Sequence, residues 1–183
     1  PKGILADSVE KIEKEQLYAV IRSIAENPDS AARGCLRSTY ALLTIDDVKV
    51  LAPQMFASIN NMAPANTMFS KGIRLAGIEA MARLRIEEGI PLTMMMMKLP
   101  DWGKAYIISV SLKVLKQYRG AAKSIIPELI KIAAEPKKSA ADREAIEKVI
   151  AIIEQDNDPP KLVSIKDYLD QKTTLKSSEK PRN

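Results

Sequence analysis

Three apolar segments of the chain align on a proline, and their spacing constrains the fold more than any other feature. The segments read "DDVKVLAPQMFASI", "EEGIPLTMMMM" and "AAKSIIPELIKIA". Pro91 follows Pro53 by 38 residues, and Pro127 follows Pro91 by 36. Each segment has helical periodicity and precedes a second helical segment. A period of about 36 to 40 residues with two helices per period is typical of a helical solenoid, whose pairs bury their apolar faces only by stacking.

Helical periodicity extends over most of the chain. A weaker copy of the repeat, "LYAVIRSIAEN", lies before the other three and lacks the proline. Strand signals are nearly absent, since no Asn-Gly or Asp-Gly hairpin turn occurs. Apolar spacing, capping residues and breakers predict helices over 7–27, 30–43, 46–61, 68–85, 87–99, 102–119, 121–135 and 139–155. The sequence therefore predicts an all-α fold of about four antiparallel helix pairs.

The pattern changes near residue 156, so we expect a helical repeat domain over 1–156 and a different segment over 157–183. Pro159 and Pro160 end the last helix. The apolar residues beyond them are expected to dock as a terminal cap: Leu162, Val163, Ile165, Tyr168 and Leu169. The final letters "KSSEKPRN" have the composition of a flexible tail.

The paired segments resemble HEAT repeats of the armadillo-like class. In those repeats a first helix with an apolar-Pro-x-apolar core precedes a second helix with a Val-Arg-x-x-Ala-type core. Ile73-Arg74 and the stretch from Ala80 to Leu84 match that second helix best. The resemblance covers roughly residues 9 to 155 and implies a short right-handed α-solenoid with an extended concave binding surface. It also implies an Asp–Arg pairing between Asp29 and Arg33, although the third and fourth pairs lack the arginine.

A longer stretch, "VLAPQMFASINNMAPANTMFSKGIRLAGIEAMARLRIEEGIP", is similar to the carboxy-terminal helical region of a family of large, uncharacterised, exported bacterial proteins. That resemblance implies a carboxy-terminal domain of an exported protein, with no known activity. The chain begins at Pro1 rather than at a methionine, and we therefore expect it to be a piece of something longer.

Composition narrows the chemistry. The chain has 183 residues, no histidine and one cysteine, Cys35. An intramolecular disulfide is excluded, and histidine-based catalysis and most zinc or iron ligand sets are excluded as well. No apolar run reaches the roughly 18 residues of a membrane span. Cys35 lies in an apolar segment and is interpreted as a buried small hydrophobe. We predict no cofactor, no metal and no enzymatic activity.

Four consecutive methionines, Met94 to Met97, allow more than one interpretation. Thioether sulfur is a ligand for copper(I), but Met94 and Met97 alone supply too few ligands. Methionine is also an adaptable core filler. Because the proline alignment places this helix in the middle of the stack, we expect at least two of the four side chains to be fully buried. An exposed, adaptable partner groove is the alternative.

A basic stretch runs from Lys98 to Lys123, with six basic residues and one acid. Lys113, Lys116 and Gln117 share one side of their helix, opposite four apolar residues, Ile107, Ile108, Leu112 and Leu115. A solvated outer stripe explains this pattern, and so does a patch for an acidic protein, nucleic acid or another polyanion. Aromatic residues for stacking bases are few in this stretch.

Repeat position predicts that the second helices share one face. On that basis we expect partner contacts from Arg37, Arg74, Lys113 and Lys116. Trp102 follows Asp101 at a helix start, and its indole either packs on the preceding helix or anchors a partner. The acidic pairs Asp46-Asp47 and Glu87-Glu88 are explained by the favourable electrostatics of helix N-termini.

The sequence thus predicts a non-catalytic interaction or scaffold module that forms part of a larger protein. The expected partner is another protein or another domain of the parent chain, bound by the face of the second helices. The alternative is a binder of nucleic acid or another polyanion through residues 98–123. A base-extruding glycosylase, known on HEAT-like folds, has only Trp102 beside Asp101 in its support.

Overall fold

Helices dominate the computed structural model, which describes residues 14–26, 36–60, 70–99 and 104–169. They are α2 (Lys14–Glu26), α3 (Leu36–Tyr40), α4 (Ile45–Asn60), α5 (Ser70–Arg83), α6 (Gly89–Lys98), α7 (Lys104–Tyr118), the 3₁₀ helix η3 (Arg119–Ile125), α8 (Ile126–Ala133), α9 (Ala140–Gln155) and α10 (Lys166–Leu169). The one extended pairing among the described residues is an isolated parallel bridge between Ile86 and Val163. The predicted all-α class is confirmed.

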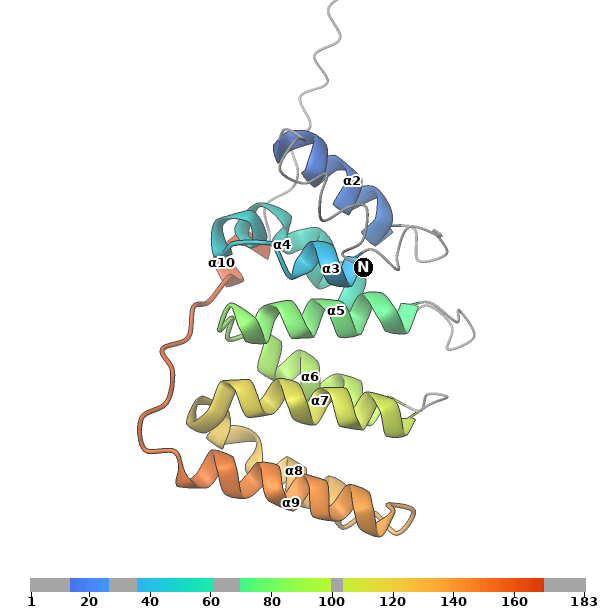
Figure 1. The fold of residues 1–183 in the computed structure, drawn as a ribbon, viewed down its shortest axis with the longest axis vertical. Helices are drawn as coiled ribbons and strands as arrows, with labels where there is room; N and C mark the ends of the chain where they lie inside the picture. Colours follow the sequence, from blue (N-terminus) through green and yellow to red (C-terminus); the bar gives the residue numbers. More distant parts are fainter. Residues whose placement is uncertain (1–13, 27–35, 61–69, 100–103, 170–183) are drawn as a thin grey trace, which may run out of the picture.

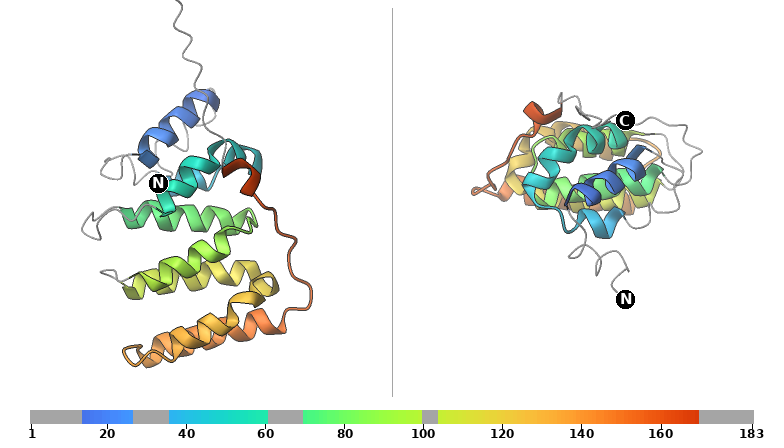
Figure 2. Two further views of the ribbon diagram at one scale, coloured as in Figure 1. Left: turned by 180° about the vertical axis from the view of Figure 1, so that it is seen from behind. Right: turned by 90° about the horizontal axis from the view of Figure 1, so that it is seen from above.

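The helices lie in two layers along the long axis of the molecule. Figure 1 shows α3, α5, α7 and α9 stacked one below another, nearest the viewer. The view from behind shows α4, α6 and α8 in the second layer (Figure 2). Within the front layer α5 packs on α7 and α7 on α9, while α4, α6 and α8 each pack on the front-layer helix that follows them. Helix α2 packs on α4 at the other end from α8 and α9.

Helix α5 is buried on almost every side because α3, α4, α6 and α7 all pack against it. Small residues make this possible, since Ala76, Ala80 and Ala82 are buried in it. Gly77 lets α4 approach closely, because a Cβ at that position would lie 2.5 Å from Cδ1 of Ile59. The centre of the core therefore lies in the front layer, not between the layers alone.

The four methionines lie on α6, which packs between α5 and α7. Met94, Met96 and Met97 are buried, with exposed fractions of 2%, 1% and 1%. Met95 is half-buried and packs at the edge of the core. The prediction of at least two fully buried methionines is confirmed, and neighbours on several sides explain why consecutive positions are apolar.

The predicted helix over 121–135 is wrong in its first turn and a half. The chain instead continues from α7 into η3, and α8 begins at Ile126. Pro127 lies in the first turn of α8, where its missing N–H costs no hydrogen bond. Glycine commonly follows the end of a helix, but the left-handed residue after α7 is Arg119, with φ of 50°, and not Gly120. Gly120 is needed for space, because a Cβ there would lie 2.8 Å from the Asp156 carbonyl oxygen.

A second left-handed arginine, Arg85 with φ of 58°, follows α5 in the same way. It precedes Arg119 by 34 residues, which is close to the repeat period. Pro53 departs from the pattern, because it lies in the middle of α4, whereas Pro91 and Pro127 lie near the starts of their helices.

Residues 156–169, which we call the strap, leave α9 and run back along one end of the layers towards α4 (Figure 1). Val163 N–H donates to the Arg85 carbonyl oxygen at 2.9 Å, and Glu87 N–H donates to the Val163 carbonyl oxygen at 3.0 Å. Helix α10 then packs on α4. The apolar residues that we expected to form a terminal cap therefore bind along the stack instead of covering its last pair.

The Glu88 carboxylate completes this attachment. It accepts hydrogen bonds from the Ser164 hydroxyl at 2.5 Å and from the Ile165 N–H at 3.1 Å. Ile165 is fully buried, so the strap combines a polar clip with an apolar anchor.

Tyr118, the last residue of α7, closes the turn between α5 and α6. Its buried hydroxyl donates to the Ile86 carbonyl oxygen at 2.7 Å. Burial, and to a smaller extent the charge of Glu88, raises the pKa of Tyr118. Gly89 leaves room for the hydroxyl, because a Cβ there would overlap it and lie 2.8 Å from Cβ of Met81.

The substitution Gly89→Ala is therefore expected to displace Tyr118 and to lower the free energy of unfolding by about 3 kcal/mol. Chemical denaturation measures the loss. Gly72→Ala is the matched control in α5, where an added Cβ meets nothing within 4 Å; it should be neutral or stabilising by up to about 1 kcal/mol. Equal effects of the two alanines would contradict the close approach at Gly89.

Candidate partner-binding surface

Lys113 and Lys116 lie on the exposed side of α7, with Ser109 one turn earlier. The opposite side is buried as the sequence predicts, and Ile107, Ile108, Leu112 and Leu115 have exposed fractions of at most 5%. Three-residue and four-residue steps on a helix bring side chains to the same face. The two lysines therefore project together from the front layer.

A groove of about 340 Å³ separates this stripe from α9. Lys148 and Asp142 line it from α9, opposite Lys113 and Lys116 on α7. Buried apolar side chains form its floor: Ile108, Leu112 and Val149. Three lysines and one aspartate make the lining electropositive, which favours an acidic ligand.

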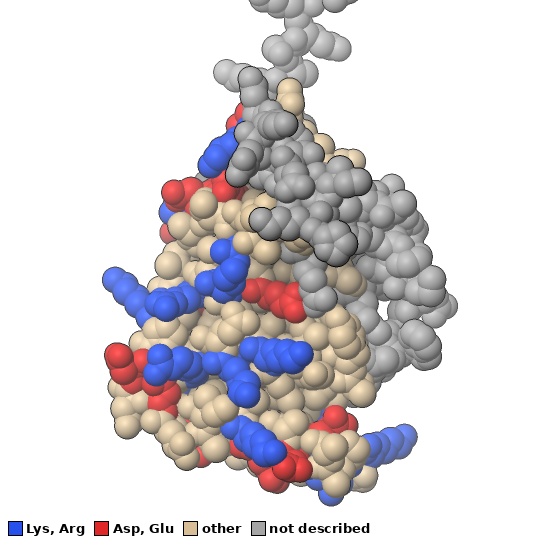
Figure 3. Space-filling view, in the orientation of Figure 1, with Lys and Arg blue, Asp and Glu red and all other residues tan. Residues whose placement is uncertain are grey.

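The electropositive character of this face is visible in Figure 3, where basic side chains gather over α7 and the neighbouring helices. Glu144, on the same helix, partly neutralises the positive charge of Lys148, because Lys148 Nζ lies 2.5 Å from a Glu144 carboxylate oxygen. That contact is an exposed pair one helical turn apart, worth only a few tenths of a kcal/mol. Lys148 can therefore exchange Glu144 for an acidic group of a ligand at little cost.

Of the other predicted contact residues, Arg74 does not lie on this surface. It is only 5% exposed, because α5 is surrounded by other helices, so the prediction that it offers a surface contact is wrong. The side chain of Arg37, in α3, lies outside the described residues, as do Trp102, Asp101 and Cys35. The structure brings Lys113 and Lys116 together but does not join Arg74 to them.

Sequence reasoning missed Lys148 and Ser109. A signal for Lys148 was present, since it follows Lys113 by 35 residues, about one repeat period. Aligning the basic positions of successive second helices, in addition to the prolines of the first helices, would have found it. Ser109 carries no such signal, because its role depends on which side of α7 the groove opens.

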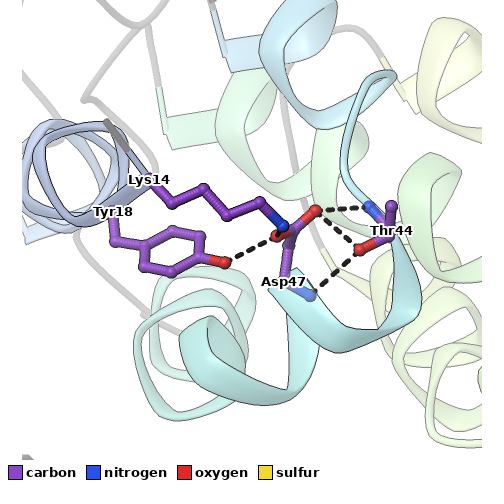
Figure 4. A network of polar contacts seen from close by, with 4 residues as sticks. All are labelled: Lys14, Tyr18, Thr44 and Asp47. Atoms are coloured by element: carbon purple, nitrogen blue, oxygen red, sulfur yellow. Dashed lines mark hydrogen bonds and ion pairs between the residues drawn. The ribbon is translucent and has the colours of Figure 1, made fainter. Parts of the chain in front are cut away.

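The densest polar cluster lies elsewhere, between α2 and α4 (Figure 4). The Asp47 carboxylate accepts hydrogen bonds from the Tyr18 hydroxyl at 2.6 Å and from Lys14 Nζ at 2.9 Å. It also accepts from the N–H and the hydroxyl of Thr44, at 2.8 and 2.7 Å. Thr44 Oγ1 in turn accepts from Asp47 N–H at 3.3 Å, so the two residues cap α4 reciprocally.

Burial, and after it the hydrogen bond to Asp47, raises the pKa of Tyr18 to about 12. Burial alone would raise the pKa of Asp47, but the hydrogen bonds from its three partners outweigh burial and hold that pKa well below its ordinary value. All acceptor positions of the carboxylate are occupied by donors of the chain itself. The cluster therefore fixes α2 on α4 and does not offer a free base.

The electrostatics of the helix N-terminus explains only one of the two acidic residues Asp46 and Asp47. Asp46 fits that explanation, since it is exposed and pairs with Lys49 at 3.0 Å. Asp47 also attaches α2 to α4. Its hydrogen bonds to Tyr18 and Lys14 span 29 and 33 residues, so no local sequence pattern predicts them.

Asp156 has a similar structural role at the other end of the stack. Its carboxylate accepts from Gly120 N–H at 2.8 Å and from the Arg119 guanidinium at 2.7 Å. The Gly120 hydrogen bond is the largest of the causes that lower the pKa of Asp156.

Among the described residues no three His, Cys, Asp or Glu side chains are grouped so as to hold a metal ion.

None of the helices in the described ranges combines the length and apolar character that crossing a membrane requires. Comparisons of the chain with protein-family models, curated proteins and solved structures gave no significant match. The HEAT-like and bacterial resemblances therefore stay predictions, and the geometry of the molecule carries the functional argument.

The Asp47 cluster predicts a pH dependence of stability. Because the pKa of Asp47 is depressed in the folded state, its ionised carboxylate stabilises the fold at pH values above the ordinary aspartate pKa. This stabilisation is lost as the pH falls. Because the pKa of Tyr18 is raised in the folded state, its protonated hydroxyl stabilises the fold fully below pH 10. This stabilisation is lost as the pH rises towards 12. We expect Tyr18→Phe to remove only the part of the alkaline loss that Tyr18 contributes, because buried Tyr118, whose pKa is also raised, keeps its own contribution. Thermal unfolding of both proteins at several pH values measures the difference.

Asp47→Asn should lower the free energy of unfolding by about 2 kcal/mol, because buried donors lose a charged acceptor. The matched control, Asp46→Asn, removes an exposed pair and should cost at most about 0.5 kcal/mol. Equal losses for the two variants would show that Asp47 acts only through the N-terminus of α4.

Proposed function

We propose that the chain is a non-catalytic interaction or scaffold module, folded as a short right-handed HEAT-like solenoid of about four helix pairs and forming part of a larger protein. The stacking of α4 with α5, α6 with α7 and α8 with α9 supports the repeat interpretation. The exported bacterial parent remains a proposal that rests on resemblance alone.

One observation carries the functional proposal. Lys113 and Lys116 from α7 converge with Lys148 from α9 around one groove with an apolar floor. Such a site suits an acidic segment with some apolar side chains, supplied by a protein partner or by another domain of the parent chain. Apolar contacts would supply affinity, and the lysines would select charge and orientation.

A polyanion is the second candidate, because the basic stretch 98–123 is electropositive. The arrangement of that stretch favours a local acidic partner instead. Lys98 forms an ion pair with Glu128, and Arg119 pairs with Asp156 at 2.7 Å. These two cations are engaged by acids of the chain, so the stretch does not supply one continuous strip for a phosphate backbone.

The test is a titration of the isotope-labelled chain followed by amide chemical shifts. The two probes are an acidic amphipathic peptide containing Glu and Leu, and a short duplex DNA. We expect the peptide to shift resonances of Ser109, Lys113, Lys116 and Lys148 at physiological salt. The DNA should act weakly and lose its effect as salt rises.

Lys113→Glu with Lys116→Glu is expected to weaken peptide binding at least about tenfold, since attraction becomes repulsion at the groove. Lys131→Glu is the matched control, because Lys131 is exposed on α8 in the other layer. Stronger binding of DNA than of the peptide would favour the polyanion function, and shifts away from the groove with both probes would refute its role.

A further inference from the structure

The charges that line the groove between α7 and α9 are unevenly distributed along its length. The two helices run in the same direction, and their carboxyl-terminal ends lie together (Figure 1). They are joined there by the Asp156 carboxylate, which accepts hydrogen bonds from Gly120 N–H and from the Arg119 guanidinium. Because each residue of a helix rises by about 1.5 Å, the distance from these joined ends gives the level of each lining residue along the groove.

One end of the groove is acidic and the other is basic. Asp142, the third residue of α9, lines the end that is farther from the joined helix ends. Lys148 follows it by six residues, which is about 9 Å along the helix axis. On α7, Lys113 and Lys116 lie within about two helical turns of the joined ends. All three lysines are therefore displaced from Asp142 in the same direction.

The Asp142 carboxylate is available to a ligand. Its backbone N–H donates to Ser139 Oγ at 3.0 Å and so completes the cap of α9, whereas the half-buried carboxylate makes no ion pair or hydrogen bond with a described residue. Lys113 and Lys116 are exposed and form no ion pair within the described part of the chain either. An acid in the first turn of a helix is favourable on any side of it, but this one lies on the side that lines the groove.

A ligand of uniform charge matches only part of this lining. A purely acidic segment meets the lysines at one end but brings a like charge to Asp142 at the other, where the two repel. A segment that carries acids at one end and a base about 9 Å away meets an opposite charge at both ends. Between the ends the floor is apolar, with Ile108, Leu112 and Val149, so apolar side chains fit between the acids and the base.

We propose that the groove binds a bipolar segment of a partner protein, whose acidic side chains lie at the three lysines and whose Lys or Arg lies at Asp142. The inference rests on the proposed function and adds to it the basic residue and the orientation of the segment. Asp142 is then the residue that determines specificity, because it rejects a segment that is acidic throughout and fixes which end of the segment lies at the beginning of α9.

Titration of the full chain at low ionic strength with three peptides tests the proposal. All three carry the same pair of Glu residues and the same Leu residues, and they have Lys, Gln or Glu at the fourth and seventh positions after the first Glu. The fourth position in an extended segment, or the seventh in a helix, lies on the side of the first Glu and on the order of 10 Å from it.

Net charge alone would make the Glu peptide bind most tightly, because the groove has more lysines than acids. We expect the opposite order. The Lys peptide should bind about threefold more tightly than the Gln peptide, and the Glu peptide should bind most weakly, since exposed charge pairs contribute modestly and are screened by salt. A nitroxide at the lysine end of the Lys peptide should broaden the amide resonance of Asp142 more than that of Lys116.

Asp142→Lys should make the Glu peptide the tightest ligand, and Asp142→Asn should abolish the advantage of the Lys peptide over the Gln peptide. Glu147→Lys is the matched control, because it is the same change of charge on α9 at an exposed residue outside the groove, and it should keep the original order. Circular dichroism checks that each variant keeps its helical content.

Two results would overturn the bipolar assignment and leave the acidic partner of the proposed function standing. One is a Glu peptide that binds the unaltered chain at least as tightly as the Lys peptide, and the other is equal broadening at Asp142 and Lys116. If none of the three peptides shifts the resonances of the groove, the proposed function fails and the inference fails with it.

Discussion

The pairing of Val163 with the turn between α5 and α6 is the contact on which the arrangement of the stack most depends. Stacked helix pairs contact mainly their neighbours, so their stability is a sum of local terms and their ends open independently. The two backbone hydrogen bonds at Val163, with the Glu88 carboxylate on Ser164 and Ile165, join residues 76 to 78 positions apart. They connect the segment after α9 to the middle of the described stack, and α10 beyond them packs on α4.

The strap also helps to position the two helices of the proposed binding surface. At its start, Asp156 holds Gly120 and Arg119, which directly follow α7. Asp156 itself follows α9, so this carboxylate connects the ends of the two helices that form the groove. Two contacts therefore set the separation of Lys113 and Lys116 from Lys148. They are the packing of α7 on α9 and the hydrogen bonds of the Asp156 carboxylate. Such preorganisation lowers the cost of binding an extended partner segment.

Much of this structure was predictable from the sequence because it depends on local periodicity. The helices α4, α5, α6, α7 and α9 begin and end within a few residues of their predicted limits. The burial of the methionines and the shared side of Lys113 and Lys116 follow from the same spacing. These features need only a helix and a neighbour on its apolar side.

The errors concern contacts between distant residues. The sequence pattern shows Arg74 as a cation on a second helix, but it cannot show that four helices surround α5. Gly120 looks like a helix terminator, and its actual constraint is an oxygen of Asp156, 36 residues away. The strap and the bonds of Asp47 to Tyr18 and Lys14 have the same origin. Contacts between residues that are far apart in the sequence produce no periodic pattern from which they could be predicted.

Native-state hydrogen exchange on the chain with Ile165→Asp tests most directly whether the strap ties the stack together. The charge replaces a fully buried side chain beside Glu88 and should release the strap, whereas Lys161→Asp, an exposed change in the same segment, should not. We predict that protection falls together in α4, in the turn between α5 and α6, and in the strap. A loss of protection confined to residues 161–169, with α4 unchanged, would contradict the account.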